Sequence, residues 1–330
     1  MRRSRGWLTA AAIATAWFLS CPTFSLGEEK SSPPQAPPPP QAPAARAPAT
    51  TPDLPTEGDR QKEAEELKRL QEFYLRNQSV FIKKGELVAE LNTFYSTDKR
   101  QEFISIGAGQ STLIQSTRRF FDTTLFARWG ILTDGLELDV IFPFLVHADQ
   151  EIRLLSGSSS SSSTGIGDIA AALRYQVWYE RGIRPGLILD IQGKSRSGGD
   201  TLRGTGNNNI GGGVTLLKSI DPVVFFGRLG YTETLSHDGR NLGNIFDYSV
   251  GMGFSLNDRV AFNMQFIGSL IGKSKIQGEV IDGSSLEIAS LQFSATILVT
   301  KQLFVEPIVV IGMTDDAFDS TIGIRIPYRF

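Results

Sequence analysis

The residues best able to bind or to carry charge are charged side chains in segments that alternate between polar and apolar positions. In an extended strand alternate side chains share one face, so each charged residue lies on the polar face of its segment. The acidic residues of this kind are Glu90, Glu137, Asp139, Asp190, Asp247 and Glu306, and the basic ones are Arg128, Arg174, Lys194, Arg228, Arg325 and Arg329.

The charges change sign from one segment to the next. Arg128 lies in one segment, Glu137 and Asp139 in the next, Arg174 in the third and Asp190 in the fourth. Opposite charges on paired strands stabilise a sheet by about 0.2–1 kcal/mol per pair. Two interpretations remain open: the charges hold a wall together, or they create a transverse field that selects or orients a solute. Since neither sign dominates, we expect weak ion selectivity.

Two histidines could support hydrolysis. His147 lies two residues before Asp149, and His237 lies between Ser236 and Asp238. A hydroxyl, an imidazole and a carboxylate in mutual hydrogen-bond contact would form a nucleophile with its general base. Proximity in sequence does not establish that contact, so we predict no catalytic residue and retain a surface hydrolase only as an alternative.

Composition excludes several other activities. The 330 residues include two His and one Cys, which cannot supply a multi-histidine or cysteine-based metal site. Residues 165–168 (GIGD) are not followed by the lysine that a phosphate-binding loop needs. A formal net charge of −2 gives no electrostatic reason to bind nucleic acid. We expect no cofactor, metal or nucleic-acid partner.

Twelve segments after residue 85 alternate between apolar and polar residues. In residues 136–147, Leu136, Leu138, Val140, Phe142, Phe144 and Val146 would share one face, with His147 on the opposite face. The twelve segments are residues 86–96, 119–132, 136–147, 166–180, 185–195, 210–220, 222–235, 245–257, 259–271, 286–299, 302–313 and 319–330. Many run to 10–14 residues, which exceeds the usual length of a soluble strand and matches a tilted transmembrane strand.

The connections between the segments alternate in length. The long polar connections are residues 97–118, 148–165, 196–209, 236–244 and 272–285, and those between them are short. Short turns on one side and long loops on the other are typical of outer-membrane barrels. We expect the long connections to be mobile, above all the serine-rich residues 156–164, and both termini of the barrel to lie beside the short turns.

The residues before the barrel divide into three parts. Residues 1–27 predict a secretory signal peptide, although lipidation of Cys21 in the sequence FLSC is a second processing route. Residues 28–56 predict a Pro-rich disordered linker, since ten of the chain's 16 prolines lie in residues 33–55. Residues 57–84 predict a short periplasmic helical segment, and residues 85–330 the barrel itself.

The helix predicted over residues 57–78 carries an apolar stripe formed by Ala64, Leu67, Leu70, Phe73 and Tyr74. A helix of this length is marginal alone and requires a partner. It could pack as a cap on the barrel mouth, or it could form a short coiled coil that makes the chain a homo-oligomer.

The chain ends on an aromatic residue of an alternating segment. Tyr328 and Phe330 share the apolar face of the last segment. This ending resembles the C-terminal signal by which bacterial outer-membrane barrels are recognised by the insertion machinery, and we predict that role for both residues.

Three stretches resemble the meta-pathway phenol-degradation-like outer-membrane transporter family. They are residues 79–96 (SVFIKKGELVAELNTFYS), residues 118–144 (RRFFDTTLFARWGILTDGLELDVIFPF) and residues 165–175 (GIGDIAAALRY). The likeness covers residues 75–330, with Trp129 where the family usually has Tyr. The family name implies movement of aromatic compounds, and a related branch is the secretion channel for functional bacterial amyloid.

The sequence therefore predicts an all-β fold: a 12-stranded antiparallel transmembrane β-barrel with a short N-terminal periplasmic helix and a Pro-rich linker. We expect it in the outer membrane of a Gram-negative bacterium, in contact with lipid, as a non-enzymatic channel for passive passage of a small apolar, amphipathic or aromatic solute. A polypeptide secretion channel gated by the periplasmic helix is the first alternative.

Overall fold

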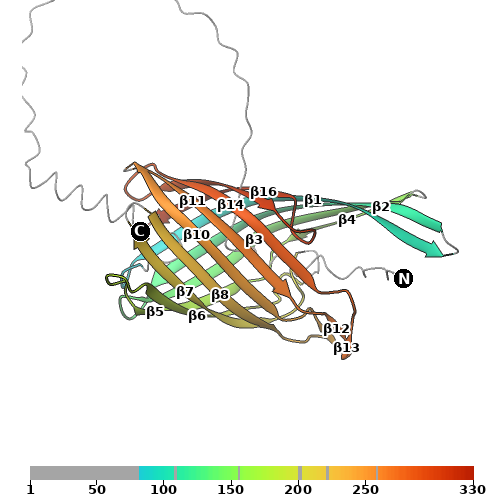
Figure 1. The fold of residues 1–330 in the computed structure, drawn as a ribbon, viewed down its shortest axis with the longest axis horizontal. Coiled ribbons are helices and arrows are strands. Elements are labelled where there is room, and N and C mark those ends of the chain that lie inside the picture. Colours follow the sequence, from blue (N-terminus) through green and yellow to red (C-terminus); the bar gives the residue numbers. More distant parts are fainter. Residues whose placement is uncertain (1–81, 108–109, 155–156, 200–202, 221–222, 258) are drawn as a thin grey trace, which may run out of the picture.

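The chain folds into a closed antiparallel β-barrel, which confirms the predicted fold class (Figure 1). The computed structural model describes residues 82–330 except residues 108–109, 155–156, 200–202, 221–222 and 258. Twelve strands form the closed wall. They are β1 (Leu87–Gly107), β2 (Gln110–Gly130), β3 (Leu136–Leu154), β5 (Ala170–Trp178), β6 (Gly186–Lys194), β7 (Asn209–Ile220), β8 (Val223–Thr234), β10 (Ile245–Asn257), β11 (Val260–Ile271), β14 (Leu286–Leu298), β15 (Phe304–Gly312) and β16 (Ser320–Arg329).

Alternation along each strand separates an apolar outside from a polar inside. On β11 the inward Asn263, Gln265 and Ser269 are buried. The outward Phe262 stacks on its neighbours across both strand boundaries, Phe254 of β10 and Phe293 of β14, with ring centroids 5.5 and 6.3 Å apart. An apolar outer surface and a polar interior are the arrangement that suits a barrel in lipid.

The barrel closes where the first and last strands pair. Val88 to Thr97 of β1 pair with Arg329 to Ser320 of β16, while β2 pairs with β3 on the other side of β1. Phe94 lies opposite Gly323 in this register, and its ring occupies the space that a side chain at Gly323 would need. The ring also packs on Ile308 and Val310 of β15, so it covers the closing strands from within.

The predicted loop over residues 97–118 is wrong: β1 and β2 continue through it as paired strands almost to their common tip. Figure 1 shows these strands projecting far beyond the rest of the barrel. Polar residues occur on both faces of this extension, so the regular alternation by which the sequence marks a strand is missing there. Pairing Asp98 with Arg118 supplies a cross-strand ion pair instead, in which Arg118 Nε donates to Asp98 Oδ2 at 2.9 Å.

The serine tract is also a strand, contrary to its prediction as a mobile loop. β4 (Gly157–Gly165) pairs in continuous register with residues 146–154 of β3, outside the closed wall. Its serine side chains are largely exposed. The serine side chains cannot form an apolar core. The extended β3 presents a row of backbone donors and acceptors, and hydrogen bonds to these groups do not depend on side-chain type.

A bulge in β3 changes the faces predicted for its outer half. Thr123 and Thr124 of β2 pair with Leu145 and Pro143, so Phe144 is an extra residue on β3. A bulge reverses the alternation beyond it. Val146 is therefore buried on the inner side and His147 is not, the opposite of the predicted assignment.

The two ends of the barrel differ. The end that holds the short turns and the C-terminus is called the turn end here, and the opposite end is the loop end (Figure 1). At the loop end a small separate sheet joins β9 (Arg240–Asn241), β12 (Lys275–Ile276) and β13 (Glu279–Val280).

The signal peptide, the Pro-rich linker and the 57–78 helix lie outside the described residues, whereas residues 82–86 form a turn and no helix. No helix of the described part is long and apolar enough to cross a membrane.

Replacing Gly323 by Ala should destabilise the closing strands, because the new methyl group would overlap the Phe94 ring. We expect a loss of about 1–3 kcal/mol in the free energy of unfolding, measured by urea titration of the barrel in micelles with tryptophan fluorescence. Gly227→Ala is the matched control, since a methyl group there meets only ordinary contacts and should change stability by about 0.5 kcal/mol or less. Equal effects of the two variants would contradict the role assigned to Phe94.

Candidate functional site in the barrel lumen

The inner wall of the barrel is a dense polar surface. Its members are buried side chains at alternate positions of their strands, including Glu90, Asn92, Thr124, Arg128, Glu137, Asp139, Asp190, Lys194, Thr215, Asn263, Gln265, Gln292, Thr296, Glu306 and Arg325. Eight of the twelve residues predicted to line a pore are in this buried set, and Arg174, Arg228, Asp247 and Arg329 are partly buried. Polar groups enclosed in this way must satisfy one another or bind something else.

Glu137 is the centre of a charge cluster near the turn end. Its side chain is 0% exposed. It accepts from Arg128 of β2 and Arg174 of β5, and each guanidinium nitrogen lies 2.9 Å from Oε1. Asp139, also on β3, has its Oδ2 3.7 Å from Nη1 of the same Arg174. These contacts bring together four of the predicted residues, with the signs alternating across three neighbouring strands as the sequence predicts.

A second ion pair spans an intervening strand. Arg228 Nη2 of β8 donates to Asp190 Oδ2 of β6 at 2.8 Å, although β7 lies between them. Gly213 of β7 pairs with both Asp190 and Gly230, and a side chain at Gly213 would overlap the Arg228 guanidinium. The glycine therefore clears the path for the ion pair. Sequence order suggests only neighbouring pairs, so this contact across a strand was not predicted.

The remaining predicted charges lie around the closing strands. Arg325 Nη1 lies 3.6 Å from Glu306 Oε2, which joins β16 to β15. Arg329 donates to Glu86 at 2.6 Å at the turn end. Glu90 forms no ion pair with a described residue, although Arg128 and Arg325 both act on it electrostatically.

Two further carboxylates lack a basic partner among the described residues. Asp122 accepts from Thr124 at 3.2 Å, and Asp247 accepts from Ser269 at 2.6 Å. Asp122 also faces the lumen and was not predicted to do so. Its position could have indicated this, because it lies an even number of residues from Arg128 on the same strand and such residues share one face. Acidic and basic groups are both present in quantity in the lumen, and the expectation that neither sign dominates stays a prediction.

Residues 82–86 fold against the barrel wall at the turn end. Ile82 is 2% exposed and packs on Val88 and Phe304, and its backbone N–H donates to Glu137 Oε2 at 3.1 Å. The Gly85 N–H donates to the Gly130 carbonyl at 2.8 Å. A side chain at Gly130 would overlap the Lys83 backbone, so this glycine lets the segment pass close to the wall. The segment was predicted only as the end of a helical part.

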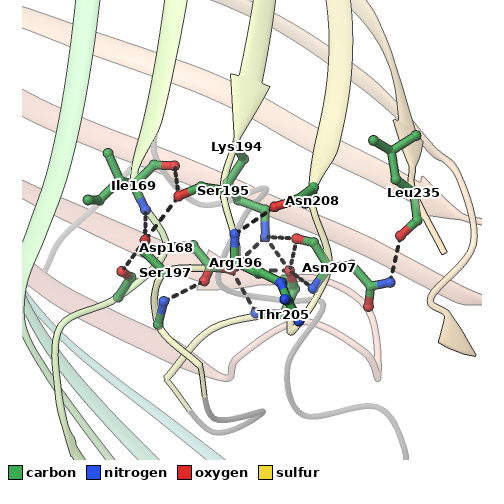
Figure 2. A network of polar contacts seen from close by, with 12 residues as sticks. Asp168, Ile169, Lys194, Ser195, Arg196, Ser197, Thr205, Asn207, Asn208 and Leu235 are labelled. Atoms are coloured by element: carbon green, nitrogen blue, oxygen red, sulfur yellow. Dashed lines mark hydrogen bonds and ion pairs between the residues drawn. The ribbon is translucent and has the colours of Figure 1, made fainter. Parts of the chain in front are cut away.

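A network of polar contacts holds a folded loop at the opposite end (Figure 2). Asp168 accepts from Lys194 Nζ at 2.6 Å and from the backbone N–H groups of Gly198 and Thr205 at 3.0 and 2.8 Å. Lys194 also donates to the Thr205 hydroxyl and to the Asn207 carbonyl. Lys194 was predicted to line the lumen, but the role of Asp168 was missed, because its sequence neighbourhood resembles an ordinary bulged strand start.

A chamber of about 70 Å³ lies beside Lys194, on the inner wall of β3, β5, β6, β7, β8 and β10. Its apolar side is formed by Ile141, Ala170, Ala172 and Ile245, and its polar side by Gln192, Lys194, Asn209, Thr232 and Asp247. Lys194 belongs both to the chamber and to the network that closes the loop end. The chamber is therefore a part of the lumen with a mixed apolar and polar lining.

A carboxylate at the turn end is held by hydrogen bonds. Glu180 follows β5 and accepts from Lys218 Nζ and from the Ser219 N–H, the latter at 3.0 Å. Desolvation acts to raise the pKa of Glu180, but these hydrogen bonds outweigh it and hold the pKa below its ordinary value. The turn between β5 and β6 is thereby fastened to the end of β7.

The predicted insertion residues lie at the turn end of β16. Tyr328 and Phe330 contact each other edge to face, with ring centroids 4.8 Å apart, and the Tyr328 hydroxyl donates to Gln302 Oε1 at 3.2 Å. Phe330 is exposed. Their recognition by the insertion machinery stays a prediction.

The histidines lie at the loop end and are not in the lumen cluster. His147 is within hydrogen-bond distance of the Thr164 hydroxyl, 2.6 Å from Nδ1, and of Asp149 Oδ2, 3.2 Å from Nε2. His237 contacts Asp238 and Arg196 instead of the adjacent Ser236. The hydroxyl–imidazole–carboxylate contact required by the hydrolase alternative is therefore present only at His147, and with Thr164, which the sequence analysis did not name.

The chain shares its fold with one solved outer-membrane barrel and has a weaker likeness to others. The COG4313 outer membrane channel from Pseudomonas putida F1 matches with a TM-score of 0.56 and 12% identity, over 77% of this chain and 98% of that one. The translocator domain of the autotransporter NalP from Neisseria meningitidis gives 0.43 and 11%, over 82% and 98%. The transport unit of AIDA-I from Escherichia coli gives 0.44 and 11%, over 80% and 99%. No family model matches the chain. At 12% identity, the likeness to the Pseudomonas putida F1 channel shows a common fold and does not extend to function.

Replacing Glu137 by Gln should destabilise the barrel strongly, because Arg128 and Arg174 would lose the carboxylate that balances them in a buried site. We expect a loss of about 3–5 kcal/mol in the free energy of unfolding, measured by urea titration in micelles. Glu151→Gln is the control: it breaks the exposed pair with Arg153 and should cost no more than about 1 kcal/mol. Similar losses in both variants would show that the cluster does not hold the wall.

Proposed function

We propose that this chain is a bacterial outer-membrane channel for the passive passage of a small amphipathic solute, and that the described state is closed. One observation carries the proposal: a pocket lined by apolar and polar side chains lies on the inner wall of the barrel, and a chain segment is hydrogen-bonded to an inward carboxylate near each end of the lumen. A barrel that served only as a support would not require a pocket of mixed polarity on its inner wall.

The fold and the distribution of polarity support this proposal. The Pseudomonas putida F1 protein that shares the fold is described as an outer membrane channel. Apolar side chains cover the outside and polar side chains fill the inside, as in barrels that conduct solutes through lipid. The resemblance of residues 79–96, 118–144 and 165–175 to a transporter family with aromatic cargo is consistent with a solute that has an apolar part.

The size of the chamber limits what the closed state can hold. A cavity that binds benzene in a protein core measures about 150 Å³, about twice the volume of the chamber here. An aromatic solute would therefore need one closure to move.

The polypeptide secretion alternative meets a steric difficulty in this state. Buried side chains from all twelve strands occupy the lumen, and Ile82 fills the turn end. Export of a chain would require both closures to leave and several ion pairs to separate. Gating by the 57–78 helix remains a proposal, because that segment lies outside the described residues. The hydrolase alternative predicts loss of ester cleavage in His147→Ala with the barrel intact.

Removing the residues before Gly85 should open the channel, because Ile82 would no longer fill the turn end. We expect residues 28–330 to stay mostly closed in planar bilayers and residues 85–330 to conduct steadily, as recorded by single-channel current. Ile82→Ala in the longer chain should give intermediate open times. Absence of current from all three proteins would contradict a water-filled pathway.

A further inference from the structure

We propose that the solute path of the channel runs along the inner face of β14 and takes an uncharged solute with a polar and an apolar part. This inference rests on the proposed function and deepens it, since it assigns the route through the lumen and the charge of the solute. The distribution of paired and unpaired polar groups on the inner wall leads to it.

The inward polar side chains of β14 occupy four successive inward positions. They are Ser290, Gln292, Ser294 and Thr296, each no more than 4% exposed. In each of them one buried side-chain oxygen forms no hydrogen bond with a described residue. On the neighbouring β11, Asn263 pairs with Ser294, and its Nδ2 also has no partner in the described part of the chain. Buried polar groups without a protein partner require a water molecule or a ligand, so we expect water or solute along this face.

The part of the wall across the barrel differs in this respect. Glu137 of β3 binds Arg128 and Arg174, and Asp190 of β6 binds Arg228 of β8. The strand that carries Arg174, β5, lies six positions from β14 in either direction around the closed wall of twelve strands. A solute that moved along that side would separate buried ion pairs, which is strongly unfavourable. The inner face of β14 has no charged residue, so movement along it separates none of its own.

Toward the loop end an apolar cluster follows the polar stretch of β14. Leu286 and Ile288, the first inward residues of the strand, belong to a buried cluster with Phe318 of the segment between β15 and β16. Ile245 of β10 belongs both to this cluster and to the lining of the luminal chamber. The chamber is thereby connected to the loop end of the β14 face through one apolar residue.

A second apolar cluster lies at the turn end of the same face. Leu298, the last inward residue of β14, packs on the cluster formed by Ile82, Val88 and Phe304. Ile82 lies before the first strand, whereas the other three belong to strands of the wall. The polar stretch therefore ends at the side chain whose removal is expected to open the turn end.

The strand beside β14 supplies an apolar strip. Ile308 and Val310 of β15 pair with Ser294 and Gln292, and both are buried. Phe94 of β1 packs on the two aliphatic side chains. A solute on this part of the wall would meet hydroxyl and amide groups on one side and hydrocarbon on the other. An uncharged molecule with a hydroxyl group and an apolar part suits both, whereas an ion would lose hydration without an opposite charge on the inner face of β11 or β14.

Cysteine labelling tests the route, because residues 28–330 contain no cysteine. Ser294→Cys and Thr296→Cys place a thiol on the proposed path. The control Thr215→Cys places one at a buried position of β7, which lies between the strands of the Asp190–Arg228 pair. Each protein in micelles is treated with hydroxyethyl methanethiolsulfonate, a small neutral amphipathic reagent, and modification is followed by mass spectrometry. We expect both β14 thiols to react about tenfold faster than the β7 thiol, the ratio that corresponds to one hydrogen bond.

Charged reagents of similar size test the solute class. Aminoethyl methanethiolsulfonate carries a positive charge and sulfonatoethyl methanethiolsulfonate a negative one. Each rate is divided by the rate of the same reagent at Ser160→Cys, an exposed position of β4. We expect both charged reagents to modify the β14 thiols about tenfold more slowly than the neutral reagent on this scale. Equal relative rates for the three reagents would refute a path for an uncharged solute.

A second variant links the route to the turn end. Ile82→Ala should raise the rate at Thr296→Cys by about tenfold and leave the rate at Thr215→Cys unchanged, because Ile82 packs only on the β14 side of the comparison. Labelling requires no current, so slow labelling of β14 in a barrel that conducts rejects this route alone, whereas absence of current rejects the channel. Equal rates at the β14 and β7 thiols, or the same effect of Ile82→Ala on both, would overturn the assignment.

Discussion

Every strand of the wall has a hydrogen-bonded neighbour on each side, and the rest of the structure depends on this closure. An unpaired backbone N–H or C=O group costs several kcal/mol in hydrocarbon, so a sheet in a membrane cannot keep an open edge. Once the sheet is closed, alternate side chains must point into the lumen. Twelve strands leave an interior in which those side chains touch, so the charges of Glu137, Arg128 and Arg174 balance one another directly.

The same arrangement of hydrogen bonds occurs near both ends of the lumen. At each end a segment of backbone turns inward, and an inward-facing carboxylate accepts its N–H groups: Glu137 accepts from Ile82, and Asp168 accepts from Gly198 and Thr205. Glycines give the room that this needs, since side chains at Gly130 and Gly204 would overlap the Lys83 backbone and the Asp168 carboxylate. Each carboxylate also binds a basic side chain of the wall, which couples the closures to the barrel.

The strand number, the strand order and the inward charges could be predicted because they follow from a period of two, which every lipid-facing strand must show. The predictions that failed concern segments in which this two-residue alternation is absent or shifted. The outer parts of β1 and β2 have polar residues on both faces, and six of the nine residues of β4 are serine, so neither shows the alternation that marks a strand. The Phe144 bulge moves Val146 inward without a local signal. Contacts across an intervening strand, such as Arg228 with Asp190, depend on a distant glycine and on barrel curvature.

The pairing of Val88 with Arg329 joins residues almost at opposite ends of the described chain. Contacts between residues so far apart in sequence form slowly, because a long loop must close before any of their hydrogen bonds is gained. The backbone groups along the edge of β1 therefore stay unpaired until the last strand has been synthesised and has reached β1. During that interval it can pair with other chains, so the yield of folded barrel depends on how quickly the C-terminal strand reaches it.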